Sequence, residues 1–147
     1  MARKHAPKGF FREHALSIVV SAILLFLLVS YRGADPSTHI GAFYGNAIAD
    51  WLGTLTFIIA TKYFYEIGSE ESRRPNPRIH ARIGRFIVKH SLTIVLALTG
   101  LIWTYAYAHS DANGKAGQVL GNIVSEWTQL IGLVVITKYV RERGSKA

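Results

Sequence analysis

The chain has 147 residues, of which 50% are hydrophobic and 18% are charged, whereas about a quarter of a soluble domain is charged. It contains no cysteine, which excludes disulfides, thiolate metal sites and cysteine nucleophiles. The 17 basic residues outnumber the 9 acidic ones and give a formal net charge of +8. We expect no nucleic-acid partner, because the sequence has no soluble module that combines basic with aromatic residues.

Four stretches are apolar and long enough to be membrane-spanning helices, since one crossing takes roughly 20 mostly apolar residues. They cover about residues 15–31, 41–62, 90–108 and 117–138. The second and the fourth each contain a single acidic residue, Asp50 and Glu126. The sequence therefore predicts an all-α integral membrane protein built as a four-helix bundle in a lipid bilayer.

The basic residues indicate how these spans are oriented. Fifteen of the 17 lie in residues 1–14, 62–90 and 138–147. Because Lys and Arg accumulate on the cytoplasmic side of a membrane, we expect both termini and the middle connection to be cytoplasmic. The expected location is a bacterial cytoplasmic (inner) membrane.

The sequence matches itself without gaps when Phe10 is aligned with Phe86. In positions 9–71 there are 18 identities among 63 pairs. The most informative pairs are Tyr31/Tyr107, Asp35/Asp111, Asn46/Asn122, Trp51/Trp127, Thr61/Thr137, Lys62/Lys138 and Glu66/Glu142. This match predicts two parallel tandem hairpin repeats, 1–69 and 85–147, joined by a cytoplasmic linker at 70–84. Both copies have an even number of spans, so they enter the membrane from the same side, unlike inverted repeats.

Small residues recur every four positions in the second helix of each hairpin, a pattern that lets helix backbones approach closely in lipid. They are Gly41, Gly45, Ala49, Gly53, Gly117, Gly121 and Ser125. We expect these residues to pack helices together and to make the second and fourth helices the central ones.

A polar stripe lies beside the small one and contains Asn46, Asp50 and Thr54 in the first copy and Asn122 and Glu126 in the second. An acid in the middle of a span costs about 3 kcal/mol or more and indicates function by default. One hypothesis is that the carboxylate and amide oxygens bind a hard cation or line a pore. Alternatively, the acids exchange protons, or they are protonated and hydrogen-bond to neighbouring helices.

Two further matched pairs have several interpretations. Trp51 and Trp127 directly follow the acids and either line a cation path or fill grooves beside the small residues. His14 and His90 are the matched histidines; they could ligate haem axially, sense pH, or serve as polar residues at the membrane interface.

We expect no enzyme, because the sequence has no nucleophile elbow and no phosphate-binding glycine loop. The leading hypothesis is a homo-oligomeric cation channel or transporter that uses the buried carboxylates and requires no cofactor beyond a bound cation. The alternative is a non-transport accessory subunit of a larger membrane complex. A haem electron carrier using both histidines is the least favoured.

Overall fold

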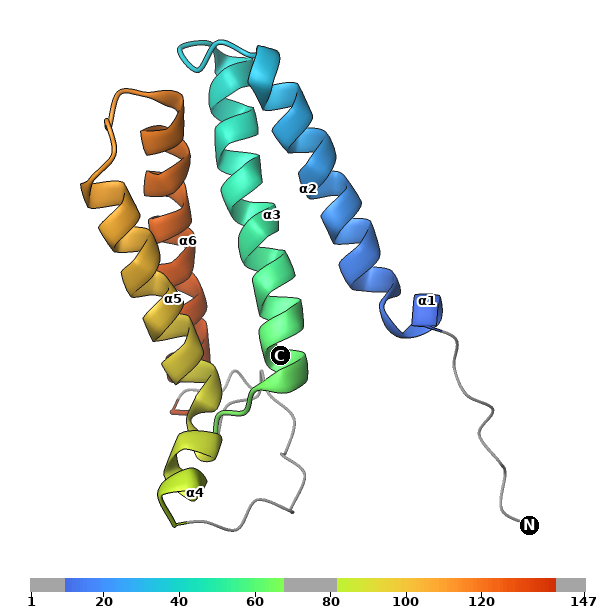
Figure 1. Cartoon of the computed structure of the whole chain (residues 1–147), viewed down its shortest axis with the longest axis vertical. Coiled ribbons are helices and arrows are strands. Elements are labelled where there is room, and N and C mark those ends of the chain that lie inside the picture. The colour runs from blue at the N-terminus through green and yellow to red at the C-terminus, as the bar shows by residue number, and fades with distance from the viewer. Residues whose placement is uncertain (1–9, 68–81, 140–147) are drawn as a thin grey trace.

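The computed structural model describes residues 10–67 and 82–139 (Figure 1). Most of the predicted linker at 70–84 and the two chain ends lie outside the described residues. Within the described part the regular elements are helices, which confirms the all-α prediction. They are α1 (Phe10–Glu13), α2 (Ala15–Gly33), α3 (His39–Tyr63), α4 (Arg82–Lys89), α5 (Ser91–Ala108) and α6 (Lys115–Ile136).

Three of these helices, α2, α5 and α6, are long and apolar enough to cross a membrane. The four ranges predicted as spans fall on α2, α3, α5 and α6. Helix α3 has 25 residues, so its length suffices. Helix α3 is not one of the three helices that are apolar enough to cross a membrane, because Asn46, Asp50 and Lys62 lower its mean hydropathy. A membrane crossing by α3 therefore stays a prediction.

The two long hairpins turn in the same way. At the first turn the backbone N–H of Ser37 donates to the Asp35 carboxylate at 2.9 Å, and at the second the N–H of Asn113 donates to Asp111 at 3.0 Å. Such bonds from an Asp side chain to the backbone two residues on stabilise a turn. Asp35 and Asp111 thus act as turn residues. We call the end of the molecule that holds both turns the hairpin end.

Helices α3 and α6 lie at the centre, as predicted from their small residues. They pack side by side and run in the same direction from the hairpin end, with α2 against α3 and α5 against α6 (Figure 1). An apolar cluster joins α3, α5 and α6 near the end opposite the turns. Its buried members are Ala60, Leu92, Leu96, Leu130 and Val134.

The predicted stripe of small residues makes several different contacts. A Cβ at Gly41 or Gly117 would overlap the backbone of that residue's own turn, at Asp35 or Asp111. Gly45 and Gly121 instead face tyrosine rings, of Tyr31 in α2 and Tyr107 in α5.

Only part of the stripe lies between the two central helices. The Glu126 side chain of α6 lies directly over Gly53 of α3. Ala49 of α3 is fully buried and packs with Ile123 and Trp127 of α6. Ser125 is exposed and lines a polar cavity. The small residues of this pattern therefore make three kinds of contact: with the backbone of a turn, with a tyrosine ring, and with the neighbouring central helix.

Candidate functional site

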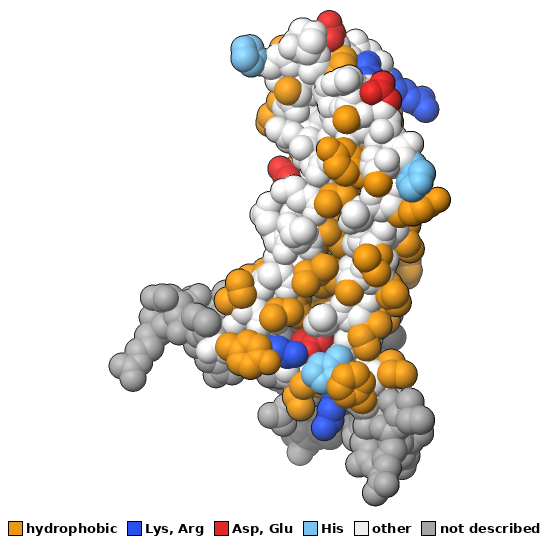
Figure 2. Space-filling view, turned by 90° about the vertical axis from the view of Figure 1, so that its left-hand side faces the viewer, with side chains coloured by type: hydrophobic (Ala, Val, Ile, Leu, Met, Phe, Trp, Pro, Cys, Tyr) orange, Lys and Arg blue, Asp and Glu red, His pale blue; other side chains and the backbone are white. Residues whose placement is uncertain are grey.

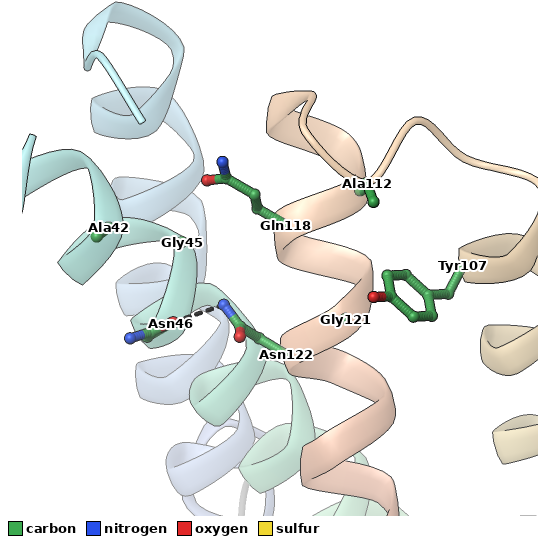
Figure 3. Close-up of a pocket in the computed structure, with 9 residues that line it drawn as sticks. Ala42, Gly45, Asn46, Tyr107, Ala112, Gln118, Gly121 and Asn122 are labelled. Atoms are coloured by element: carbon green, nitrogen blue, oxygen red, sulfur yellow. Dashed lines mark hydrogen bonds between the residues drawn. The ribbon is translucent and has the colours of Figure 1, made fainter. Parts of the chain in front are cut away.

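Two asparagines meet between the central helices. Asn46 and Asn122 each lie seven residues after the first residue of their helix, so helices that start at the same level bring them side by side. Nδ2 of Asn122 donates to Oδ1 of Asn46 at 2.5 Å (Figure 3). The two polar stripes thus meet at their first position.

A cavity of about 450 Å³ lies on the hairpin side of this asparagine pair. Figure 3 shows Gln118 and the two asparagines on the walls, with Tyr107 on the side of α5. Glycines and alanines form much of the remaining wall. Their small side chains leave the space open, and the amides offer both donors and acceptors.

A second cavity, of about 240 Å³, shares the asparagine pair and contains both predicted acids. It is lined by Asn46, Asp50, Asn122, Ser125, Glu126 and Gln129. The acids lie four residues after the asparagines, one helical turn further from the hairpin end. The two cavities together form a polar groove along α3 and α6, which we call the amide–acid groove.

The two carboxylates of this groove lack compensating charge. Among the side chains that the structure describes, neither Asp50 nor Glu126 makes an ion pair or a side-chain hydrogen bond, and no basic residue lines either cavity. The two acids line the same cavity. Two neighbouring carboxylates without a basic partner favour a bound cation or protons, since like charges at close range repel.

The groove is open along one side. Asp50 and Thr54 are exposed on the surface of the single chain, while Glu126 is half-buried over Gly53. In the described part of the chain, no group of three or more His, Asp or Glu side chains is placed to hold a metal ion. A cation between Asp50 and Glu126 would therefore take further oxygen ligands from the amides, from water or from another chain.

The tryptophans that follow the acids point to packing contacts. The buried indole of Trp127 donates from Nε1 to Thr99 Oγ1 at 2.8 Å and packs edge-on against Trp103. Trp51 packs against the buried cluster at the α2–α3 contact, which includes Leu27. Neither ring lines the amide–acid groove. A role for Trp51 and Trp127 along a cation path stays a prediction. Their contacts match the other interpretation, in which the rings pack between helices beside the small residues.

Sequence reasoning missed an ionic cluster at the end opposite the turns. Glu66 is fully buried, and its Oε1 accepts from Nδ1 of His90 at 2.6 Å and pairs with the ammonium of Lys138. Figure 2 shows acidic, basic and histidine side chains together near this end, at the bottom of the described part of the chain. Burial alone would raise the pKa of Glu66, but hydrogen bonds from Lys138, Thr93 and His90 hold it below its ordinary value.

The matched pairs in the sequence were the signal for this cluster. Glu66, His90 and Lys138 each have an identical counterpart in the other repeat. A lysine at the end of a membrane span usually extends its side chain to the water at the membrane interface. Lys138 does not do so, because its side chain is only 15% exposed and its ammonium pairs with Glu66.

The two histidines are each engaged locally. Nδ1 of His14 accepts from Lys62 at 3.2 Å, and Nδ1 of His90 contacts Glu66. These contacts involve different helices and do not bring the two rings together, so the haem hypothesis gains no support from them. Comparisons with family profiles, with curated proteins and with solved structures found no match to this chain.

Proposed function

We propose that this protein is a homo-oligomeric membrane protein that binds and moves a small cation through the amide–acid groove. The observation that carries this proposal is the pair of adjacent carboxylates, Asp50 and Glu126, without a basic partner in the described part of the chain. A hard cation meets the needs of such a site, because carboxylate and amide oxygens are its preferred ligands.

The route that we propose runs from the hairpin end to the acids. The cavity of about 450 Å³ near the turns would admit a hydrated cation. The side-chain oxygens of Asn46 and Asn122 would then replace part of the hydration shell, and the two carboxylates would hold the charge. Beyond them the apolar cluster that includes Leu96 and Val134 would keep the path closed until the helices rearrange.

We further propose that two tandem hairpins, with α3 crossing the membrane beside α2, α5 and α6, form the protomer. The equivalent turns at Asp35 and Asp111 and the equivalent contacts of Tyr31 and Tyr107 support the repeat. The basic residues support a cytoplasmic position for the end opposite the turns, with the hairpin end on the outside of an inner membrane.

A second copy of the chain would complete the site. Asp50 lies on the surface of a single protomer, and a carboxylate facing lipid at this depth costs about 3 kcal/mol or more. Covering the open side with the same groove of another copy would remove that exposure. It would also add a second set of amide and carboxylate oxygens around the cation.

Cation flux in proteoliposomes tests this function. The parent protein should conduct or exchange at least one of Na⁺, K⁺, Ca²⁺, Mg²⁺ or H⁺, and the double variant Asp50→Asn with Glu126→Gln should abolish that flux. The control variant Asp35→Asn removes an exposed acid and should retain it. Absence of flux in the parent for all five cations would reject transport and favour the accessory-subunit hypothesis. Unchanged flux in the double variant would reject the site.

A further inference from the structure

Glu66 ties the end of α3 to the other hairpin. It lies three residues after Tyr63, the last residue of α3. Its carboxylate pairs with His90 and Lys138, and the backbone N–H of Thr93 donates to Oε2 at 3.4 Å. We call this arrangement the Glu66 clasp, because an acid from the first hairpin is held by a histidine and a lysine of the second.

The first hairpin carries the same two receptor side chains in contact with each other. His14 and Lys62 are the counterparts of His90 and Lys138 in the repeat. Nζ of Lys62 donates to Nδ1 of His14 at 3.2 Å, although the two residues are 48 positions apart. A histidine and a lysine side chain therefore meet directly at the end of α2 and α3 opposite the turns, whereas their counterparts His90 and Lys138 meet through the Glu66 carboxylate.

The backbone around the two histidines is also alike. His14 has φ −116° and ψ 10°, and His90 has φ −121° and ψ 17°. Each ring packs on the phenylalanine four residues earlier, with centroids 4.5 Å apart for Phe10 and 4.7 Å apart for Phe86. The His14 position is thus shaped like the one that holds Glu66.

The His14–Lys62 pair lacks the acid that the Glu66 clasp contains. Among the side chains that the structure describes, no carboxylate makes an ion pair or a hydrogen bond with His14 or Lys62. Lys62 is exposed, whereas the side chain of Lys138 is 15% exposed. A receptor with a cationic donor and a histidine, but no carboxylate, is complementary in charge to a glutamate.

We propose that the carboxylate of Glu142 of the same chain docks on His14 and Lys62 and forms a second clasp, reciprocal to that of Glu66. Glu142 is the counterpart of Glu66 and the one acid among residues 140–147. It follows Tyr139 by three residues, as Glu66 follows Tyr63. Three residues reach about 10 Å when extended, and α6 runs beside α3 in the same direction.

One difference makes the second clasp the weaker of the two. At the Glu66 clasp, the hydroxyl of Ser91 accepts from the backbone N–H of Tyr65 at 2.8 Å. The counterpart of Ser91 is Ala15, which has no hydroxyl. With one hydrogen bond fewer, the Glu142 clasp opens more readily than the Glu66 clasp.

Disulfide cross-linking of the full-length protein tests the occupant, since the chain has no native cysteine. The pair Ala15→Cys with Arg141→Cys, the counterparts of Ser91 and Tyr65, leaves His14, Lys62 and Glu142 intact. It is compared with the control pair Ala15→Cys with Ser145→Cys, whose second cysteine is four residues further along the chain. Under mild oxidation the first pair should form a disulfide within one chain at least tenfold faster. Equal rates would overturn the proposal. Disulfides between copies would overturn it too and identify a second copy as the occupant.

A second measurement leaves the tail sequence unchanged. Lys62→Met removes the cationic half of the receptor, and Lys115→Met removes a lysine at the hairpin end. In detergent, Lys62→Met should raise the rate of tryptic cleavage after Arg141 and Arg143 at least threefold, and Lys115→Met should not. Equal cleavage rates in both variants would contradict a clasp at Glu142.

Discussion

Asn46 and Asn122 occupy equivalent positions in the two halves of the chain and hydrogen-bond to each other, with 2.5 Å between Nδ2 of Asn122 and Oδ1 of Asn46. When two equivalent residues contact each other, the surfaces that carry them are self-complementary, as in a two-fold interface. An axis relating the two proposed repeats would therefore run between α3 and α6. The two acids lie one turn further along the same helices, which is why they share a cavity.

Replacing Gly117 tests the packing of a helix start on its turn. A Cβ at this position would overlap the Asp111 carbonyl group, whereas nothing lies within 4 Å of a Cβ at Gly132 in the same helix. Gly117→Ala should lower the free energy of unfolding by about 1–3 kcal/mol, the usual cost of overpacking. Gly132→Ala should raise it by up to about 1 kcal/mol, because glycine weakens a helix. Unfolding in detergent measures both, and equal effects would contradict the contact.

Replacing Glu66 tests the clasp and its pH dependence. Glu66→Gln removes one member of a buried ion pair and should cost about 3–5 kcal/mol of unfolding free energy. The hydrogen bonds of the clasp lower the pKa of Glu66 in the folded protein. Its stabilisation is therefore complete above the unfolded pKa of about 4.3 and is lost as the pH falls through the lower folded value.

The measurement for Glu66 is the unfolding free energy of parent and variant between pH 7 and pH 3. The difference between the two proteins should shrink as the pH falls below about 4.3, because the Glu66 of the parent then becomes protonated on unfolding. A difference that is the same at every pH would show that the charge of Glu66 does not contribute.

Replacing Trp127 separates a packing role from a role along the cation path. Trp127→Phe removes the bond to Thr99 Oγ1 and should cost about 1–2 kcal/mol of stability. Flux per protein molecule should be unchanged, since the ring does not line the amide–acid groove. Trp51→Phe is the control, because no hydrogen bond of the Trp51 indole occurs among the described residues. A selective change of flux in Trp127→Phe would reinstate it as a path-lining residue.

A cysteine at Gln129 tests the proposed second copy. Gln129 lines the open groove beside the acids, whereas Leu101 is an exposed residue of α5. In lipid, Gln129→Cys should cross-link into covalent dimers, and Leu101→Cys should remain monomeric under the same oxidation. Monomers at position 129 together with dimers at position 101 would move the interface to α5.

The helices could be predicted from the sequence because each is a long apolar run between polar turns, and the ranges agree closely with α2, α3, α5 and α6. The match of the sequence to itself also predicted that Asn46 and Asn122 hold equivalent places. The contacts of the individual small residues could not be predicted. Gly41 packs against its own turn and Gly53 against Glu126, yet both belong to the same four-residue pattern in the sequence. Nor could the partners of Glu66, because they come from other helices and only the folded chain brings them together.

The most direct test of a cation at the two acids is their protection from a lipid-soluble carbodiimide, which modifies protonated carboxyl groups. In liposomes at fixed pH and ionic strength, mass spectrometry would quantify the modification of Asp50 and Glu126 in Na⁺, K⁺, Ca²⁺ and Mg²⁺, with the large organic cation N-methyl-D-glucamine as reference. We predict that one of these cations suppresses the modification of both groove acids in a saturable manner, relative to N-methyl-D-glucamine. The same extent of modification in all four cations would contradict cation binding in the amide–acid groove.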